Sequence, residues 1–591
     1  MPRSTFAFSN FTSGELSPRL DGRIDLPKYF SGCKTLENMI VHPHGGATRR
    51  PGTRFIAETK SNGEARLVPF EFSTTQTYVL EFGNTYMRVY KDGGQVLNSG
   101  TPVEISTPYS AAEANELKFA QSADVLFIVH PSHQPRKLSR TSHTSWTLSL
   151  YAPTNNPFTS TNNFPSTITF FEERLVFAGT NAAPQKIFFS KSGDFEDMTT
   201  GTNATDGMTF TIGSDQVNAI KYIKGLRTLL IGTTGGEFVA TASSSAEPIT
   251  PTNIQIKRQA GYGTSEVDAL LAGNRILFVQ RAGKKVRELV FDFDTDGYIA
   301  PDLTILAEHI GGSGVGTGFT NWTYQQEPDS IVWVVRSDGV LTGMTYQRGE
   351  NVVAWHRHIL GGAFSGGDAV VESVAAISNS TASSKGEDTL YMIVKRTING
   401  GTKRYIEYLQ PFDFGSNIED AWFLDSGLLY SGGATTSLSG LDHLEGQTVS
   451  ILANGATHAD KVVSSGAITL DRSATKVIVG LKYTSKLQTM RIESGSAEGV
   501  AQGKVKRIHE IVARFFETVG AEIGSSSSQV DLIPFRDSSM AMGQPVSLFT
   551  GDKSIEFASD YETDNFVYIQ QTQPLPMTVT ALFPQLNTYD G

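Results

Sequence analysis

Short apolar runs alternate with turn residues along most of the chain after about residue 65. Residues 78–82 (YVLEF) and 86–90 (YMRVY) are two such runs, and Asp92-Gly93-Gly94 follows them. Alternation with period two is typical of β-strands that are buried on one face. Asp-Gly and Gly-Gly supply the positive φ angles that a tight hairpin turn requires. The pattern therefore predicts a meander of antiparallel strands.

Comparable groups of strands recur along the chain at a spacing of about 40 residues, which is typical of propeller blades. They cover residues 117–150, 168–212, 219–258, 267–310, 321–359 and 373–412. One small antiparallel sheet per unit predicts an all-β fold built on a β-propeller. No sequence motif marks each blade, so the predicted number of blades is about six to eight. A string of β-sandwiches is the alternative. Repetition without a linker-like break favours the propeller.

The chain is too long for one compact core, so we expect several regions. The repeat occupies residues 66–412 and leaves an N-terminal segment, 1–65, and a C-terminal β-rich region, 413–591. Within the C-terminal region, residues 476–483 and 508–523 are long strand candidates. The serine-rich stretch 524–528 is predicted to be a flexible loop.

Glycine and proline interrupt the N-terminal segment too often for long regular elements. Its apolar residues Leu36, Met39 and Ile40 have a spacing that suits one helical turn or a short buried segment.

Three arginines surround a Pro-Gly turn in this segment: Arg49, Arg50 and Arg54. Guanidinium groups suit bidentate pairing with carboxylates of a neighbouring element or subunit. Solvated charges on an exposed turn are the alternative. We predict that the three arginines form a subunit or inter-domain interface.

Several stretches resemble one family. They are FTSGELSPRLDGRIDLPKY at 11–29, GCKTLENMIVHPHGGATRRPGTRF at 32–55, LKFAQSADVLFIVHP at 117–131, RLVFAGT at 174–180 and LDHLEGQTV at 441–449. Together they resemble the tail nozzle proteins of short-tailed (podovirus) bacteriophages, also called tail tubular protein B. The resemblance covers most of the chain but contains no catalytic signature.

The resemblance implies a structural protein of the virion tail, assembled in the host bacterial cytoplasm. Such a protein forms a homo-hexameric ring below the tail adaptor of the portal complex, docks tail fibres or spikes, and encloses the channel through which genomic double-stranded DNA leaves. It also implies that the N-terminal segment packs with the C-terminal region.

Charge and composition limit the partners. The net charge of −11 disfavours stable binding to a nucleic-acid backbone, which needs clustered Lys and Arg. The basic groups at 284–287 and 504–507 are short, so we expect DNA to pass without tight binding.

The single cysteine, Cys33, allows no intrachain disulfide and is expected to be a buried apolar residue. No apolar run approaches the roughly 20 residues of a membrane helix, so we expect no membrane segment.

No motif of a phosphate loop, a zinc protease or a serine hydrolase is present, and we expect no enzymatic activity. The alternative is a phage receptor-binding or carbohydrate-depolymerising propeller, in which a pair such as Glu172-Glu173 could take part in catalysis.

We also expect no metal and no other cofactor. Residues 292–297 (DFDTDG) match the first half of a calcium loop, but the twelfth position is Leu303 instead of a bidentate Glu. Two pairs of histidines have a spacing of two residues, as zinc ligands can, but no further ligand stands near them in the sequence. These pairs are His42 with His44 and His356 with His358.

Overall fold

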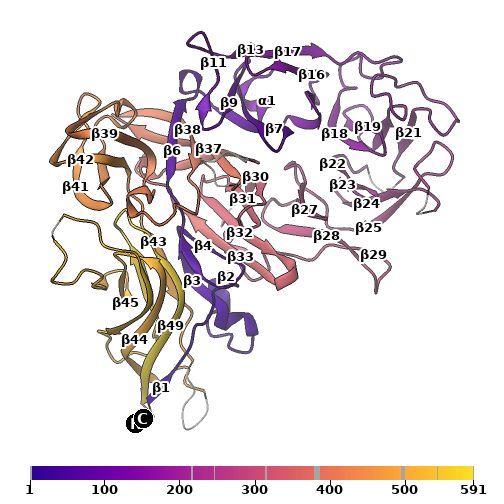
Figure 1. The fold of residues 1–591 in the computed structure, drawn as a ribbon. Coiled ribbons are helices and arrows are strands. Elements are labelled where there is room, and N and C mark those ends of the chain that lie inside the picture. The colour runs from indigo at the N-terminus through magenta and orange to yellow at the C-terminus, as the bar shows by residue number, and fades with distance from the viewer. Residues whose placement is uncertain are drawn as a thin grey trace.

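The computed structural model describes residues 3–213, 217–244, 247–312, 316–378, 386–493, 500–541 and 543–589. The fold is all-β, as predicted (Figure 1). Helical elements are short. They are α1 (Ala111–Ala114) and the 3-10 turns η1 (Pro18–Leu20), η2 (Pro27–Ser31), η3 (Lys60–Asn62), η4 (Glu308–Gly311), η5 (Arg348–Glu350), η6 (Ile418–Asp420) and η7 (Asp442–Leu444).

Seven antiparallel blades form a propeller within the part of the chain that the structure describes. Blade 1 contains β7 (Ala65–Ser73), β8 (Gln76–Gly83), β9 (Tyr86–Lys91), β10 (Gly94–Gln95) and β13 (Glu104–Ser106). Blade 2 contains β14 (Lys118–Ser122), β15 (Val125–His130), β16 (His133–Ser142) and β17 (Ser145–Leu150). Blade 3 contains β18 (Pro165–Phe171), β19 (Arg174–Thr180), β20 (Lys186–Phe189) and β21 (Met208–Thr211).

The next blades follow the same order. Blade 4 contains β22 (Ile220–Gly225), β23 (Leu229–Thr233), β24 (Gly236–Thr241) and β25 (Gln255–Ala260). Blade 5 contains β26 (Leu270–Ala272), β27 (Arg275–Val279), β28 (Val286–Asp292) and β29 (Gly297–Ile299). Blade 6 contains β30 (Phe319–Gln325), β31 (Ile331–Arg336), β32 (Leu341–Gln347) and β33 (Val352–His358). The predicted propeller is confirmed, and seven blades lie within the predicted range.

Blade 7 combines strands from both ends of the repeat. Its first three strands are β36 (Val370–Ile377), β37 (Thr389–Ile398) and β38 (Gly401–Leu409), and its fourth is β6 (Thr53–Glu58). Strand β36 also packs against β7 of blade 1. Pairing of an N-terminal strand with the last blade therefore closes the circle.

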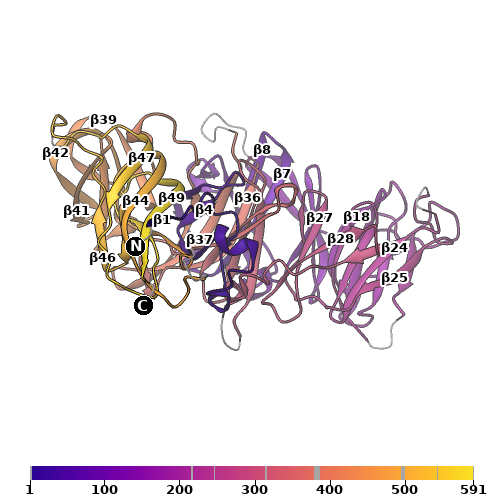
Figure 2. The ribbon, with the colours of Figure 1, turned by 90° about the horizontal axis from the view of Figure 1, so that it is seen from below.

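The N-terminal segment also joins the propeller to the C-terminal region. Strands β2 (Gly14–Glu15) and β3 (Gly32–Glu37) lie between blade 6 and β43 (Ser485–Thr489), which makes one sheet of ten strands. Strand β6, the fourth strand of blade 7, also pairs with β39 (Asp425–Ser439), which makes one sheet of eight. Figure 2 shows this indigo segment where the two parts of the molecule meet.

A third sheet belongs to the far end of the C-terminal region. Strands β4 (Met39–Val41) and β5 (Ala47–Arg49) pair into it beside β49 (Thr578–Tyr589), and β1 (Arg3–Thr5) pairs with the other part of β49. The remaining strands of this region are β40 (Thr448–Ala453), β41 (Ala456–Val462), β42 (Ala467–Leu481), β44 (Val505–Thr518), β45 (Glu522–Ser526), β46 (Gln529–Leu532), β47 (Phe549–Glu556) and β48 (Tyr568–Gln571). Short pairs are β11 (Leu97–Asn98) with β12 (Thr101–Pro102) and β34 (Ala363–Phe364) with β35 (Gly367–Asp368).

One apolar core is shared by the two ends of the chain. Phe8, Phe11 and Cys33 from the N-terminal segment pack in one cluster with Ile511 and Leu582 from the C-terminal region. Cys33 is fully buried, and burial raises the pKa of its thiol, so it packs as an apolar residue.

Of the two alternatives for Leu36, Met39 and Ile40, the short buried segment is confirmed: all three are fully buried on β3 and β4, on either side of Asn38, whose φ is 54°. One local prediction was wrong. Most of the stretch predicted as a serine-rich flexible loop belongs to β45, because its backbone groups pair with β48 and β46. Tertiary pairing overrides local composition in strands.

Gly52 supplies a test of the joint between blade 7 and the C-terminal region. A Cβ atom there would fall within 3.0 Å of the Leu424 backbone, and the Gly52 N–H donates to the Trp422 carbonyl at 2.7 Å. We predict that Gly52→Ala destabilises the protein by about 1–3 kcal/mol, because the backbone cannot give way. Gly349→Ala is the matched control, since a Cβ there meets no atom within 4 Å. Equal unfolding temperatures for the two variants would contradict this close approach.

Candidate functional site

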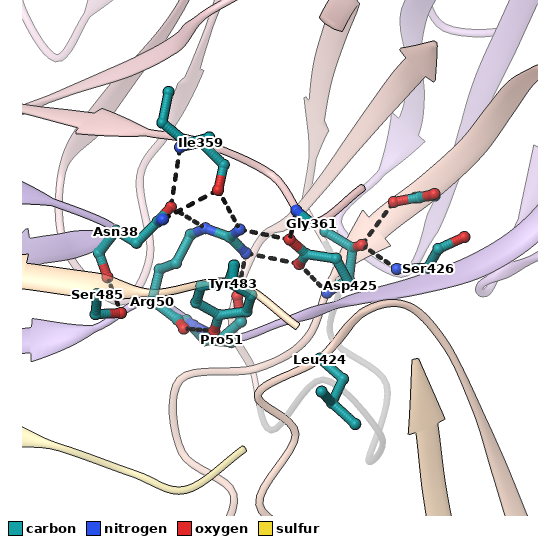
Figure 3. Close-up of polar contacts among 12 residues, drawn as sticks. Asn38, Arg50, Pro51, Ile359, Gly361, Leu424, Asp425, Ser426, Tyr483 and Ser485 are labelled. Atoms are coloured by element: carbon teal, nitrogen blue, oxygen red, sulfur yellow. Dashed lines mark hydrogen bonds and ion pairs between the residues drawn. The ribbon is translucent and has the colours of Figure 1, made fainter. Parts of the chain in front are cut away.

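Arg50 is a fully buried arginine at the meeting point of three parts of the chain (Figure 3). It follows β5 and precedes Pro51, which favours an extended backbone at Arg50. Its guanidinium binds Asp425 in a bidentate ion pair, with Nη2 to Oδ2 at 2.6 Å and Nη1 to Oδ1 at 2.8 Å. The two side chains are 2% and 0% exposed, so the pair is shielded from solvent.

The other guanidinium donors of Arg50 also have partners. Nε donates to Asn38 Oδ1 at 3.0 Å, Nη1 to the Pro51 carbonyl at 2.9 Å, and Nη2 to the Ile359 carbonyl at 3.5 Å. All five N–H groups of the fork are therefore used, which is the condition for burying a charged arginine without a large penalty.

Asp425, the first residue of β39, is equally well satisfied. Besides Arg50, its Oδ1 accepts from the Thr53 N–H at 3.2 Å and its Oδ2 from the Gly361 N–H at 2.7 Å. The carboxylate thus fixes the start of β6 and the segment after β33 to the C-terminal region.

Asn38 connects the same three parts through its amide. Its Oδ1 accepts from the Ile359 N–H at 3.0 Å, and its Nδ2 donates to the carbonyls of Ile359 at 3.0 Å and Thr484 at 2.8 Å. Asparagine tolerates the left-handed backbone better than most residues, so this position can both turn the chain and bind Arg50.

Arg49 is buried beside Arg50 and binds backbone carbonyls. Its guanidinium donates to the carbonyls of Gln573, Leu575 and Tyr483. The Tyr483 ring lies 4.5 Å from the guanidinium carbon of Arg49 and 3.8 Å from that of Arg50. An aromatic face next to both cations offsets part of the cost of their burial.

A second buried ion pair lies next to the first, within blade 7. Arg396 on β37 pairs with Glu407 on β38, and both side chains are 0% exposed. The Thr53 hydroxyl donates to Glu407 Oε2 at 2.6 Å, and Arg396 Nε donates to the Gly361 carbonyl at 2.7 Å. Thr53 and Gly361 therefore touch both ion pairs. We call this group the arginine junction: Asn38, Arg49, Arg50, Thr53, Gly361, Arg396, Glu407, Asp425 and Tyr483.

Burial and charge act in opposite directions on the two arginines. Burial lowers the pKa of the Arg49 guanidinium. Burial would also lower the pKa of Arg50, but the adjacent Asp425 carboxylate raises it above its usual value. Both side chains remain cations. The junction therefore stays charged and holds three parts of the chain in one arrangement.

The three predicted arginines differ in position. Arg49 and Arg50 lie inside the arginine junction, whereas Arg54 is exposed, with its guanidinium carbon 6.0 Å from the Trp422 ring. A role of the three residues in a subunit interface stays a prediction. The sequence analysis missed Asn38 and Asp425, although Asp425 directly follows the apolar run at 421–424, an unusual place for an acid.

The two histidine pairs occupy different environments. His356 and His358 are fully buried on β33 and contact each other, Nδ1 to Nε2 at 2.7 Å. Burial lowers the pKa of His356 to about 3 and holds that of His358 well below its usual value, so both rings are neutral and packed. His42 binds Asp329 at 2.6 Å and Thr48 at 2.8 Å, and its ring stacks on His44.

The candidate acidic sites form turns. Residues 292–297 make the hairpin between β28 and β29, where Asp292 accepts from the Thr295 N–H at 3.1 Å. Glu172 and Glu173 form the turn between β18 and β19 with φ angles of 46° and 60°, and Glu172 accepts from the Ile249 N–H at 2.6 Å.

A cavity of about 1350 Å³ is lined by the first strands of all seven blades. Its charged lining includes Lys221 paired with Glu266 and Lys224 paired with Asp268 at 2.6 Å. These opposite charges largely cancel, so the cavity does not present a strong field of one sign.

No family model and no curated protein matches the sequence. Among solved structures, the chain is similar to the WD40 repeats of RRP9, at 10% identity over 61% of this chain and 99% of that chain, with a TM-score of 0.38. It is also similar to the β-propeller domain of Myceliophteria thermophila Cps50 (Swd1), at 8% identity over 60% and 99%, with a TM-score of 0.35. A third is BamB from Moraxella catarrhalis, at 10% identity over 61% and 98%, with a TM-score of 0.32. No helix in the described ranges is both long and apolar enough to span a membrane.

Truncation of Arg50 tests the arginine junction. We predict that Arg50→Ala lowers the free energy of unfolding by about 3–5 kcal/mol, because it leaves the buried Asp425 carboxylate without its counter-charge. Arg54→Ala removes an exposed arginine of the same segment and should cost less than about 1 kcal/mol. Thermal unfolding of both variants measures the difference. Similar losses in the two would show that the buried pair contributes no more than a solvated turn charge.

Proposed function

We propose that this protein is the tail nozzle of a short-tailed bacteriophage and has a structural role without enzymatic activity. In the virion tail it forms a homo-hexameric ring below the tail adaptor of the portal complex. The ring encloses the channel for genome exit, and tail fibres or spikes dock on its side. The observation that carries the proposal is the position of residues 32–55. They combine the resemblance to the nozzle family with strand pairing to blade 6, to blade 7 and to the C-terminal region.

The continuity of the sheets supports a mechanical role. Two propeller blades continue into C-terminal sheets through strands of the N-terminal segment. Backbone hydrogen bonds that run across a boundary resist relative motion better than a side-chain interface, which usually permits domain motion. A part of the tail that encloses the exit channel and docks fibres or spikes has to keep the channel and its outer parts aligned.

The charges support passage of the duplex without tight binding. Each Lys or Arg that neutralises a phosphate adds affinity and would slow the DNA. In the basic group at 284–287, Arg287 is largely buried and donates to Gln280 and the Ala300 carbonyl. In the group at 504–507, Lys506 is buried and donates to the Ala501 carbonyl. These two cations are therefore used inside the subunit.

The assembly can be tested with purified components. We predict that electron micrographs of the protein mixed with the tail adaptor show a closed sixfold ring, and that native mass spectrometry gives six copies per complex. Closed cyclic symmetry is the usual outcome for one repeated heterologous contact. A species with one copy bound to one adaptor subunit would refute the proposed ring. Adhesion of the isolated protein to host cells would favour the receptor-binding alternative.

A further inference from the structure

A group of two histidines and two glutamates lies between blades 1 and 2. Glu113 belongs to α1, in the connection between the blades, and Glu116 follows three residues later. His130 ends β15 and His133 begins β16. The two histidines are direct partners across the hairpin, so their rings project to the same face, with centroids 5.2 Å apart.

The side chains converge on one point. His133 Nε2 lies 3.0 Å from Glu113 Oε1, and His130 Nε2 lies 3.2 Å from Glu116 Oε2. Glu113, His130 and His133 each offer a ligand atom, and these atoms lie within 4.8 Å of one another. Tetrahedral zinc with bonds of about 2.0–2.1 Å requires donor atoms roughly 3.4 Å apart. A contraction of about 1.4 Å at most would therefore bring these three donor atoms to that separation.

We propose that this cluster is a zinc site in which Glu113, His130 and His133 are ligands and Glu116 can supply the fourth. Imidazole nitrogen and carboxylate oxygen are ordinary zinc donors. The bound ion would tie the connection after blade 1 to the first hairpin of blade 2. Its role would be to stabilise the propeller at this point.

The surroundings already hold two of the ligands in place. Glu113 completes a capping box in which its Oε2 accepts from the Ser110 N–H and hydroxyl, both at 2.8 Å, so that Oε1 faces His133. The ring of Tyr109 packs edge-on against His133, with centroids 5.2 Å apart. Such outer contacts orient metal ligands and reduce the cost of binding.

Metal binding has to change the tautomer of His130. His130 Nδ1 accepts from the Ser132 N–H at 3.1 Å, so the neutral ring carries its proton on Nε2, which faces Glu116. Zinc at Nε2 moves the proton to Nδ1, and the Ser132 amide then has to turn away. Binding therefore requires the other tautomer of His130 and reorganises the turn between β15 and β16.

The test is a metal titration of the full-length protein after treatment with a chelator. Cobalt(II) serves as the probe because its visible absorption reports tetrahedral coordination, and zinc is then added to displace it. We expect one cobalt ion per chain. His133→Ala and Glu113→Gln should each weaken cobalt binding by at least about tenfold. Loss of an outer contact alone can weaken metal binding by that much, and loss of a ligand should weaken it at least as much.

Two features keep the test decisive. Glutamine at position 113 preserves the capping box, so this variant should fold even if His133→Ala does not. His44→Ala removes an exposed histidine elsewhere and should bind cobalt as the unaltered protein does. The assignment is wrong if the unaltered protein binds no cobalt, or if either ligand variant keeps its affinity. In that case the four side chains form a hydrogen-bonded cluster only.

Discussion

The structure depends on the burial of one ion pair, Arg50 with Asp425. Taking two charges out of water costs several kcal/mol for each ion, and their attraction offsets this cost only when every remaining donor and acceptor is satisfied. Those partners come from Asn38 in the N-terminal segment, from residues 359–361 after blade 6, and from the C-terminal region itself. The pair is therefore stable only when all three parts are in place, which makes the joint specific as well as strong.

This requirement explains why the first 58 residues are not an appendage. Their strands complete blade 7, extend blade 6 and enter the far sheet of the C-terminal region. Arg50 and Asp425 are 375 residues apart in the sequence, so the joint connects parts of the chain that are distant in sequence. The sheets therefore continue across the joint, as the proposed nozzle requires.

The sequence was informative where structure is local and repeated. Alternating apolar residues with glycine turns predicted the propeller, and the strand groups matched the blades closely because each blade is a local meander. The arginine cluster was visible through its unusual chemistry, but its burial was not. Nothing local marks Asp425 as the partner of Arg50, or places Glu113 beside His133, because these pairs form only through tertiary contacts.

A double-mutant cycle on Arg50 and Asp425 tests the central claim most directly. The free energy of unfolding is measured for the unaltered protein, Arg50→Ala, Asp425→Ala and the double variant. If the pair controls the joint, removing the second partner costs little after the first is gone, and the coupling energy exceeds about 1 kcal/mol. Losses that add to within about 0.5 kcal/mol would show that the two residues act independently and would contradict this account.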